Sequence, residues 1–233
     1  MQVSPELFDR LPADSVLRQL GPWELEAFLQ YAQTRRLAAG ESLLEQGAQG
    51  DSMMIVLSGT LKACLRTAEG REVVLDYLGP GSVIGEMAVF VEKPRAADVV
   101  AIEPATVIVM QRRFVIAYLE KAPAVAMRII QAMCGKLRRA NLRLEDGAGT
   151  ATPARLARAL LRLLSDHGIA RTDDAAPGLR ISQEELGNYV GLARENVNRH
   201  LRRWAESGIV RISRGEIAVL DTDALEAVAL GLD

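Results

Sequence analysis

Short runs of β-favouring residues alternate with glycines between about Arg35 and Arg112, and this pattern limits the fold more than any other. Three of the runs, at 53–57, 73–78 and 106–110, have the length and the Val, Ile and Leu content of strands. Turn signals that recur about every eight to twelve residues are typical of a β-sandwich or barrel. The glycines that separate the runs are Gly40, Gly47, Gly50, Gly59, Gly70, Gly79, Gly81 and Gly85.

The stretch that follows Ile84 interrupts this pattern with a Gly-Glu pair, a short apolar turn and a Pro-Arg-Ala-Ala sequence. Gly85 has no Cβ and lets the backbone approach a ligand, and an ionised Glu86 accepts hydrogen bonds, as a ribose hydroxyl requires. Met87–Phe90 can form one helical turn with free N–H groups, and Arg95 offers paired donors to two phosphate oxygens. These residue types predict a site for a compact sugar phosphate. The alternative is a tight turn beside a solvated arginine.

The run IGEMAVFVEKPRAADV resembles the phosphate-binding cassette of cyclic-nucleotide-binding domains. Such domains occur in protein kinase regulatory subunits and in the Crp/Fnr family of bacterial transcription regulators. The resemblance implies that Glu86 binds the ribose 2′-hydroxyl and that Arg95 binds the cyclic phosphate. The preceding run AAGESLLEQGAQGDSMMIVLSGTLKA resembles the first half of the β-roll of the same domains, so the two stretches support each other.

Composition describes an ordinary soluble protein. The chain has 233 residues, enough for two small domains, and a net charge of −2. Residues 1–6 lack the basic and apolar parts of a signal peptide, and no apolar run is long enough to span a bilayer. We therefore expect a cytoplasmic protein without membrane contact. The two cysteines, Cys64 and Cys134, argue against a disulfide framework and are expected to be reduced residues of the core.

Residues 112–146 are expected to form one long helix. Apolar side chains on one face recur at steps of three and four residues, which indicates pairing with a second helix. Val125, Ile129 and Ala132 could form another face that packs on the chain's own β-roll. The Crp/Fnr resemblance implies that this helix forms a parallel homodimer and lies over the ligand pocket. The expected interface residues are Ala126, Ile130, Met133, Leu137, Ala140 and Leu144.

The segment 181–220 has the order of a winged helix-turn-helix. Ser182 followed by Glu185 is a capping box that begins a helix, and Gly191 provides a sharp turn before a second helix. The residues from Ile209 onwards read as two strands about a turn. This order resembles the DNA-binding domain of Crp/Fnr regulators and predicts double-stranded DNA with a palindromic operator as the partner.

The second of these helices carries the residues that suit DNA recognition. Arg194, Glu195 and Arg199 match the family's positions for base contacts, since arginine can bridge guanine O6 and N7 and glutamate can accept from cytosine N4. Arg202 suits a phosphate contact, which positions the protein without reading sequence. Ala193 replaces the usual Ser or Thr cap, at an expected cost of about 1 kcal/mol. The expected DNA-binding residues are Ser182, Arg194, Glu195, Asn198, Arg199 and Arg202.

Other cofactors and catalytic sites do not fit the sequence. Some relatives hold an iron–sulfur cluster with four cysteines and others bind haem, whereas this chain has two cysteines and two histidines, His167 and His200. We expect neither haem nor an iron–sulfur cluster. The sequence has no nucleophile elbow, phosphate-binding loop or zinc-ligand spacing, so we expect no enzyme, no catalytic residues and no metal site.

The ligand class is better defined than the ligand. In the family the base meets residues late on the long helix, here near Ala140 and Asn141, and an amide can pair with adenine or guanine. Ala96 leaves room beside the phosphate and resembles cassettes that prefer cAMP, where threonine favours cGMP. Asp98 departs from the usual small hydroxyl residue and is expected to add a negative charge near the phosphate. The ligand expected first is therefore cAMP, then cGMP; cyclic di-GMP, or no ligand, stays open.

The sequence as a whole predicts an α+β protein with an N-terminal, jelly-roll-like cyclic-nucleotide β-roll, a long dimerisation helix and a C-terminal winged helix-turn-helix. The expected divisions are 1–111, 112–146, 147–152 and 153–233. The third is a hinge, because two glycines free its backbone and Thr152-Pro153 can begin a new helix. The expected function is allosteric transcription regulation by a homodimer, with RNA polymerase as a further partner. The alternative of another class is a nucleotide-sensing regulatory subunit that binds a protein.

Overall fold

The computed structural model describes residues 11, 15–18, 20, 22–67, 72–147, 151–167, 177–213 and 215–232. The expectations for residues 1–10 and for the centre of the hinge fall outside these ranges. The chain divides into two compact units. The first comprises Met1–Arg71 and Leu75–Arg138, and the second comprises Glu72–Val74 and Arg139–Asp233.

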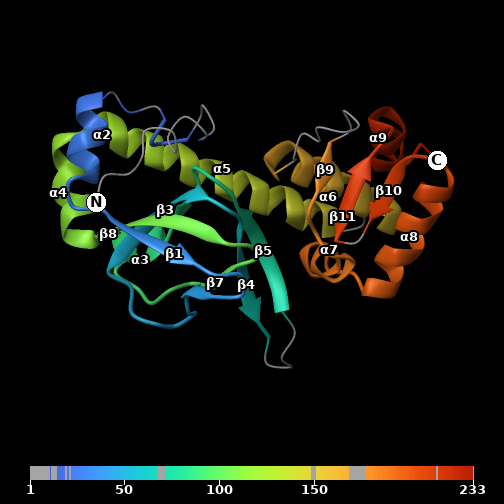
Figure 1. Ribbon diagram of the computed structural model, residues 1–233, viewed down its shortest axis with the longest axis horizontal. Coiled ribbons are helices and arrows are strands. Elements are labelled where there is room, and N and C mark those ends of the chain that lie inside the picture. Colours follow the sequence, from blue (N-terminus) through green and yellow to red (C-terminus); the bar gives the residue numbers. More distant parts are fainter. Residues whose placement is uncertain are drawn as a thin grey trace. The chain divides into compact units, whose positions relative to one another are not determined.

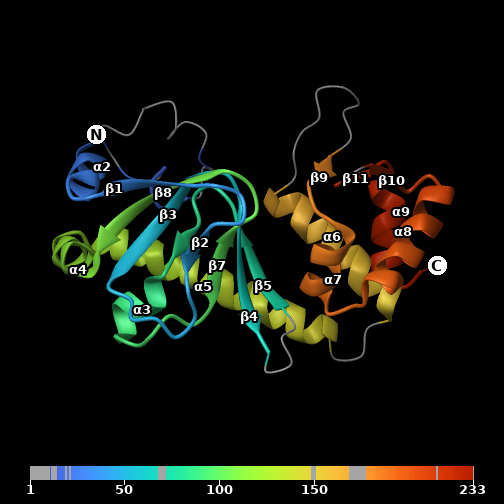
Figure 2. The same cartoon turned by 60° about the horizontal axis from the view of Figure 1, so that its bottom comes forward.

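Two four-stranded sheets form the predicted β-roll (Figure 1; Figure 2). One sheet has the order β1-β8-β3-β6, with bounds Gln33–Leu37, Ala105–Gln111, Ser52–Ser58 and Val83–Ile84. The other has the order β2-β7-β4-β5, with bounds Ser42–Leu44, Asp98–Ala101, Leu61–Arg66 and Glu72–Leu78. The three strands expected from the sequence lie within β3, β5 and β8, so this part of the prediction is confirmed.

Strand β3 lies between two hydrophobic cores, which explains its unbroken apolar run. Met53 and Ile55 face a core that includes helical residues such as Phe28. Met54 and Val56 face a second core between the two sheets. Because successive side chains of a strand point to opposite faces, a strand covered on both faces needs apolar residues at every position.

Four helices contribute residues to the first of these cores, and the last of them, α5, continues beyond Arg138 into the second unit. Their bounds are α2 Pro22–Leu29, α3 Glu86–Val91, α4 Arg112–Lys121 and α5 Pro123–Gly147. The single helix predicted over 112–146 is wrong, since the chain leaves the helical conformation at Ala122 (φ −129°, ψ 68°). The ring of Pro123 disfavours a helical residue before it. No described helix is both long and apolar enough to cross a membrane.

The inward face of α5 agrees with the sequence. Val125 and Ile129 are fully buried, and Ala132 packs against the same core. Met133, expected in the outward-facing seam, also packs against this core. The seam predicted from the sequence therefore mixes residues of two faces.

The second unit contains the expected helix-turn-helix and wing. Its element bounds are α6 Thr152–His167, β9 Gly178–Leu179, α7 Gln183–Val190, α8 Arg194–Glu206, β10 Val210–Ser213, β11 Glu216–Val219 and α9 Thr222–Leu230. The capping box of Ser182 and Glu185 is confirmed. Thr152, predicted as the cap of α6, is instead its first residue. The wing has a third strand, β9, beside β11, and α9 packs against α6; neither element was predicted from the sequence.

Candidate functional site

Arg95 is a buried cation held inside the β-roll. It is 6% exposed, and its Nη1 and Nη2 donate hydrogen bonds to the carbonyl of Gly85 (3.0 Å) and to Ser52 Oγ (3.1 Å). These bonds use two of the five N–H donors of a guanidinium, so the group can still donate to an anionic ligand.

Two glycines make room for this guanidinium. A Cβ on Gly85 would lie 2.4 Å from Arg95 Nη1, and a Cβ on Gly50 would lie 2.4 Å from Arg95 Nε. Gly85 also has a φ of 77°, a left-handed conformation that other residues rarely adopt. The predicted reason for Gly85 was close approach of the backbone to a ligand. In the structure, its lack of a side chain accommodates Arg95.

Burial and neighbouring carboxylates act on Arg95 in opposite directions. Burial lowers the pKa of Arg95, whereas the charges of Asp51 and Glu86 raise it. Arginine remains protonated in proteins because its unperturbed pKa is so high. The site therefore offers a permanent positive charge with little competing water, which suits an anion.

Glu86 is the second buried charge of the cassette. It is 6% exposed and is the first residue of α3. Its Oε1 accepts a hydrogen bond from Lys136 Nζ of α5 at 3.0 Å, and the same ammonium donates to the carbonyl of Val83. Glu86 and Lys136 are 50 positions apart, so no local sequence pattern predicted this contact. The sequence signal for this contact is that Lys136 follows the inward-facing Met133 of α5 by three residues, so both lie on the same face of the helix.

The other predicted ligand residues are more open. Met87 is 52% exposed, and Ala96 is also exposed. Ala140 and Asn141 are exposed residues of the second unit, and their contact with a nucleotide base stays a prediction. Asp98 has partners of its own: its Oδ1 accepts from the Gln46 amide at 2.8 Å and its Oδ2 lies 3.5 Å from Arg66 Nε. Its negative charge is thus compensated locally, which weakens the expected conflict with a phosphate.

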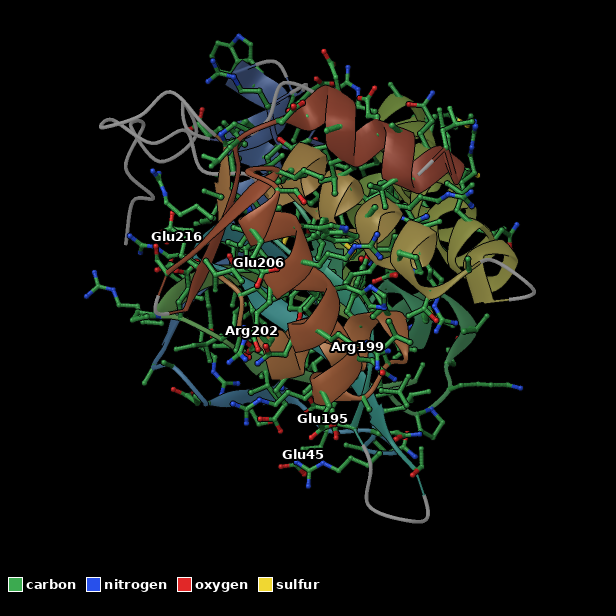
Figure 3. All side chains as sticks on the ribbon, turned by 90° about the vertical axis from the view of Figure 1, so that its right-hand side faces the viewer. Glu45, Glu195, Arg199, Arg202, Glu206 and Glu216 are labelled. Carbon is green, nitrogen blue, oxygen red and sulfur yellow. The ribbon has the colours of Figure 1, made fainter. Side chains whose placement is uncertain are left out.

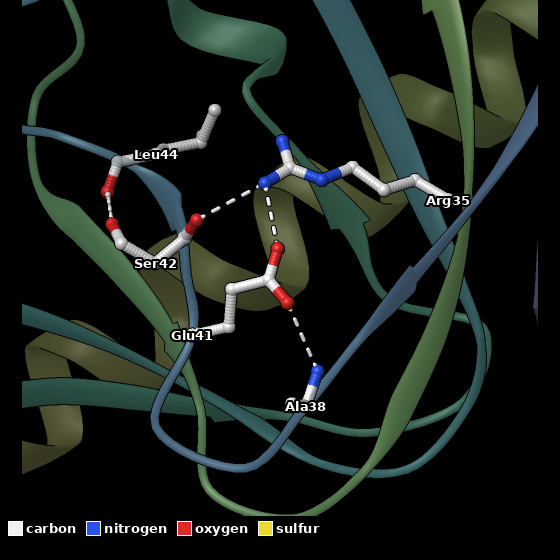
Figure 4. A network of polar contacts seen from close by, with 5 residues as sticks. All are labelled: Arg35, Ala38, Glu41, Ser42 and Leu44. Atoms are coloured by element: carbon white, nitrogen blue, oxygen red, sulfur yellow. Dashed lines mark hydrogen bonds and ion pairs between the residues drawn. The ribbon is translucent and has the colours of Figure 1, made fainter.

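A cavity of about 820 Å³ lies beside Arg95, lined by residues of β1, β2 and the 45–52 segment together with Met54 and Val109. Figure 4 shows a polar network at its edge, in which Arg35 pairs with Glu41 (3.1 Å) and donates to the carbonyl of Ser42. The Ala38 amide, followed by Arg35, lowers the pKa of Glu41. The network links β1 and the residue after it, Ala38, to the start of β2.

The outer face of α8 carries the predicted DNA-binding side chains. Arg194, Glu195, Arg199 and Arg202 are exposed, and Figure 3 shows three of them along α8 with Glu206. The opposite face buries Val197, Leu201 and Trp204, which fixes the orientation of the helix. Asn198 is half-buried. Ala193 caps α8 without a side-chain hydrogen bond, as predicted.

Ser182 has a different local role from the other predicted DNA-binding residues. Its Oγ accepts from the Glu185 amide (3.1 Å) and donates to Glu185 Oε2 (2.8 Å). The hydroxyl thus stabilises the start of α7, and a DNA contact by this residue stays a prediction.

The outward face of α5 is apolar. Met127, Ile130 and Leu137 are 55%, 48% and 63% exposed. Cys134, expected in the core, is exposed between them, whereas Cys64 is buried as expected. The steps from 127 to 130, 134 and 137 are three, four and three residues, the spacing of a helix-pairing seam.

Comparison with known proteins agrees with this geometry. A family profile described as "Cyclic nucleotide-binding domain" matches residues 34–122, and one described as "Crp-like helix-turn-helix domain" matches residues 154–228. The chain is 32% identical to the "Cyclic AMP receptor protein" of Thermus thermophilus, over 91% of this chain and 95% of that one. The chain belongs to the Crp/Fnr family of transcription regulators.

Other members of the Crp/Fnr family extend this likeness. The "CRP-like cAMP-activated global transcriptional regulator" of Mycobacterium tuberculosis is 27% identical over 91% of this chain and 97% of its own. The solved structure of a c-di-GMP responsive regulator from Xanthomonas campestris aligns with a TM-score of 0.75 at 21% identity, over 85% of this chain and 99% of that one. That second likeness shows the shared fold. The chain is therefore a DNA-binding transcription regulator with a cyclic-nucleotide-binding domain.

Replacing Lys136 by methionine tests the contact between α5 and the cassette. Lys136→Met keeps an unbranched side chain but leaves the buried carboxylate of Glu86 without its ammonium partner. We expect the free energy of unfolding, measured by urea denaturation without ligand, to fall by about 1–3 kcal/mol.

Lys121→Met is the matched control, because Lys121 is exposed at the end of α4. Its free energy of unfolding should differ from that of the wild type by no more than about 0.5 kcal/mol. Equal stabilities of the two variants would contradict the assigned contact.

Proposed function

We propose that the chain regulates transcription as a homodimer whose affinity for DNA depends on a cyclic nucleotide, with cAMP the first ligand to test. The observation that carries this proposal is the pair of buried, opposite charges on the cassette, Arg95 and Glu86. A buried ionised group is costly unless it is paired or binds a charged partner. Two relatives are named for cAMP, and this supports cAMP over other nucleotides.

Arg95 and Glu86 supply complementary chemistry to such a ligand. The remaining donors of Arg95 can bind two oxygens of a cyclic phosphate. Glu86 has one oxygen engaged with Lys136, and the other can accept from a ribose hydroxyl. Ribose binding would therefore act on a carboxylate that already contacts α5.

This shared carboxylate suggests how the ligand reaches the DNA-binding domain. A ligand that changes the Glu86–Lys136 contact changes the free energy of one position of α5 relative to another. A ligand shifts an equilibrium only by its differential affinity for the two states. Movement at the predicted hinge, 147–152, would then let the α8 helices of two chains enter successive major grooves, about one DNA turn apart.

The homodimer would form through the outward face of α5. Met127, Ile130, Cys134 and Leu137 give that face its apolar character. Ile130 and Leu137 belong to the seam expected from the sequence, whereas Met133 is engaged with the chain's own core. The proposed interface therefore uses Met127 and Cys134 in place of the predicted Ala126 and Met133.

Each alternative ligand or partner predicts a different experimental result. Binding of cGMP or cyclic di-GMP in place of cAMP would keep the fold and change the effector. DNA binding of equal strength with and without every nucleotide would indicate a constitutive regulator. Failure to retard any palindromic DNA would favour a regulatory subunit that binds a protein. A contact with RNA polymerase is a further proposal that rests on the family alone.

The Arg95→Ala variant tests the ligand site by calorimetric titration with cAMP. Losing hydrogen bonds to a charged group should weaken binding by roughly 1.5–3 kcal/mol. Circular dichroism first establishes that the variant is folded. Lys93→Ala, an exposed change in the same cassette, should bind cAMP as the wild type does.

Two results with these variants would contradict the proposed role of Arg95. Equal affinities of Arg95→Ala and the wild type would remove Arg95 from the phosphate site. If Lys93→Ala lost as much affinity as Arg95→Ala, the effect would reflect the charge of the cassette and not the buried guanidinium.

The dimer is tested by Leu137→Glu, which places a charge in the proposed seam. Analytical ultracentrifugation should show a monomer or a dissociation constant raised at least about tenfold, because the two glutamates would meet across a parallel pair. Arg138→Glu adds the same side chain at the neighbouring exposed position and should remain dimeric. A Leu137→Glu variant that sediments as the wild-type dimer would refute this interface.

A further inference from the structure

Arg199 on α8 is held by a neighbouring residue, Asn196. Its Nη2 donates to Oδ1 of Asn196 at 2.8 Å. Residues three apart lie next to each other on a helix surface, so this contact is compatible with an intact α8. Among the described residues, Arg194 and Arg202 on the same helix make no side-chain hydrogen bond.

The local structure explains why Asn196 is available for this role. In α7 the third helical residue, Glu185, bonds back to Ser182 in the capping box. Asn196 occupies the equivalent position of α8, but Ala193 has no side-chain oxygen to complete such a box. The Asn196 amide N–H bonds to the Ala193 carbonyl (2.9 Å), and its side-chain oxygen accepts from Arg199 instead.

The chemistry of the contact suits DNA reading. An amide oxygen orients the guanidinium without cancelling its charge, which a carboxylate would partly do. The bond uses one N–H of Nη2 and leaves the other N–H of Nη2 and those of Nη1 free. Two such parallel donors are what guanine O6 and N7 require.

We propose that Asn196 is a positioning residue that sets the plane of the Arg199 guanidinium and so sharpens its preference for one base. This inference rests on the proposed binding of operator DNA. A free arginine on an exposed helix can turn to a phosphate as readily as to a base. Held by Asn196, Arg199 loses that bond when it turns away, so the base-reading orientation is favoured before DNA arrives.

The test begins with an operator selected by the wild-type protein from a random palindromic library, with and without cAMP. Affinities for that operator and its single-base variants are then measured by fluorescence anisotropy for Asn196→Ala, Arg199→Ala and the double variant. Asn196→Ala should reduce discrimination roughly fivefold, at the same position of each half-site that Arg199→Ala affects. Affinity for non-specific DNA and the salt dependence of binding should stay unchanged.

Three comparisons separate positioning from other roles. Asn196→Asp keeps the acceptor, so it should retain the base preference, while its added negative charge should weaken binding to all DNA sequences alike. Asn196→Ala should have no further effect on discrimination in the Arg199→Ala background. Glu206→Ala, an exposed change at the far end of α8, should leave discrimination as in the wild type.

The outcomes that overturn the inference are distinct. Equal weakening on all sequences by Asn196→Ala would make Asn196 a helix-stabilising or phosphate-binding residue. Loss of discrimination at a different base, or an undiminished effect without Arg199, would make it a direct reader. A wild-type protein that selects no site would remove the proposed function itself, whereas failure of the variants alone would leave that function standing.

Discussion

The buried guanidinium of Arg95 is the interaction on which the cassette depends. The Arg95 side chain is 6% exposed, and it donates hydrogen bonds to the carbonyl of Gly85 and the hydroxyl of Ser52. The carboxylates of Asp51 and Glu86 favour its charged form. Two glycines, Gly50 and Gly85, give it space that any Cβ would fill. Removing such a group from water is costly, and the surrounding structure compensates for this only in part. The proposed phosphate ligand would accept hydrogen bonds from the donors of Arg95 that Gly85 and Ser52 leave unused.

Glu86 connects the cassette to helix α5. It begins the cassette helix, it lies near Arg95, and it accepts a hydrogen bond from Lys136 on α5. The same helix presents an apolar outward face in the first unit and continues into the second unit. A single carboxylate therefore joins the proposed ligand site to α5, the helix that carries the proposed dimer interface. The proposed allostery therefore depends on the hydrogen bond between Glu86 and Lys136.

Much of this could be predicted from the sequence, because the relevant signals are local. The cassette, the strands of the β-roll and the capping box of α7 each depend on residues within about a dozen positions of one another. The register of the α5 seam could not be predicted, because this helix is apolar on two faces. Ile129 and Met133 pack inward while Ile130 and Leu137 point outward, so spacing alone fits either set. The Lys136 contact depends on the tertiary fold, which brings residue 136 to residue 86.

In the proposed mechanism, ligand bound at the Arg95–Glu86 site changes the affinity of α8 for DNA. The most direct test is the affinity of the wild-type protein for its selected operator, measured by fluorescence anisotropy without nucleotide and with saturating cAMP. An allosteric coupling of ordinary size predicts a change of at least about fivefold. Saturable cAMP binding in the calorimeter, together with an unchanged operator affinity, would contradict the claim.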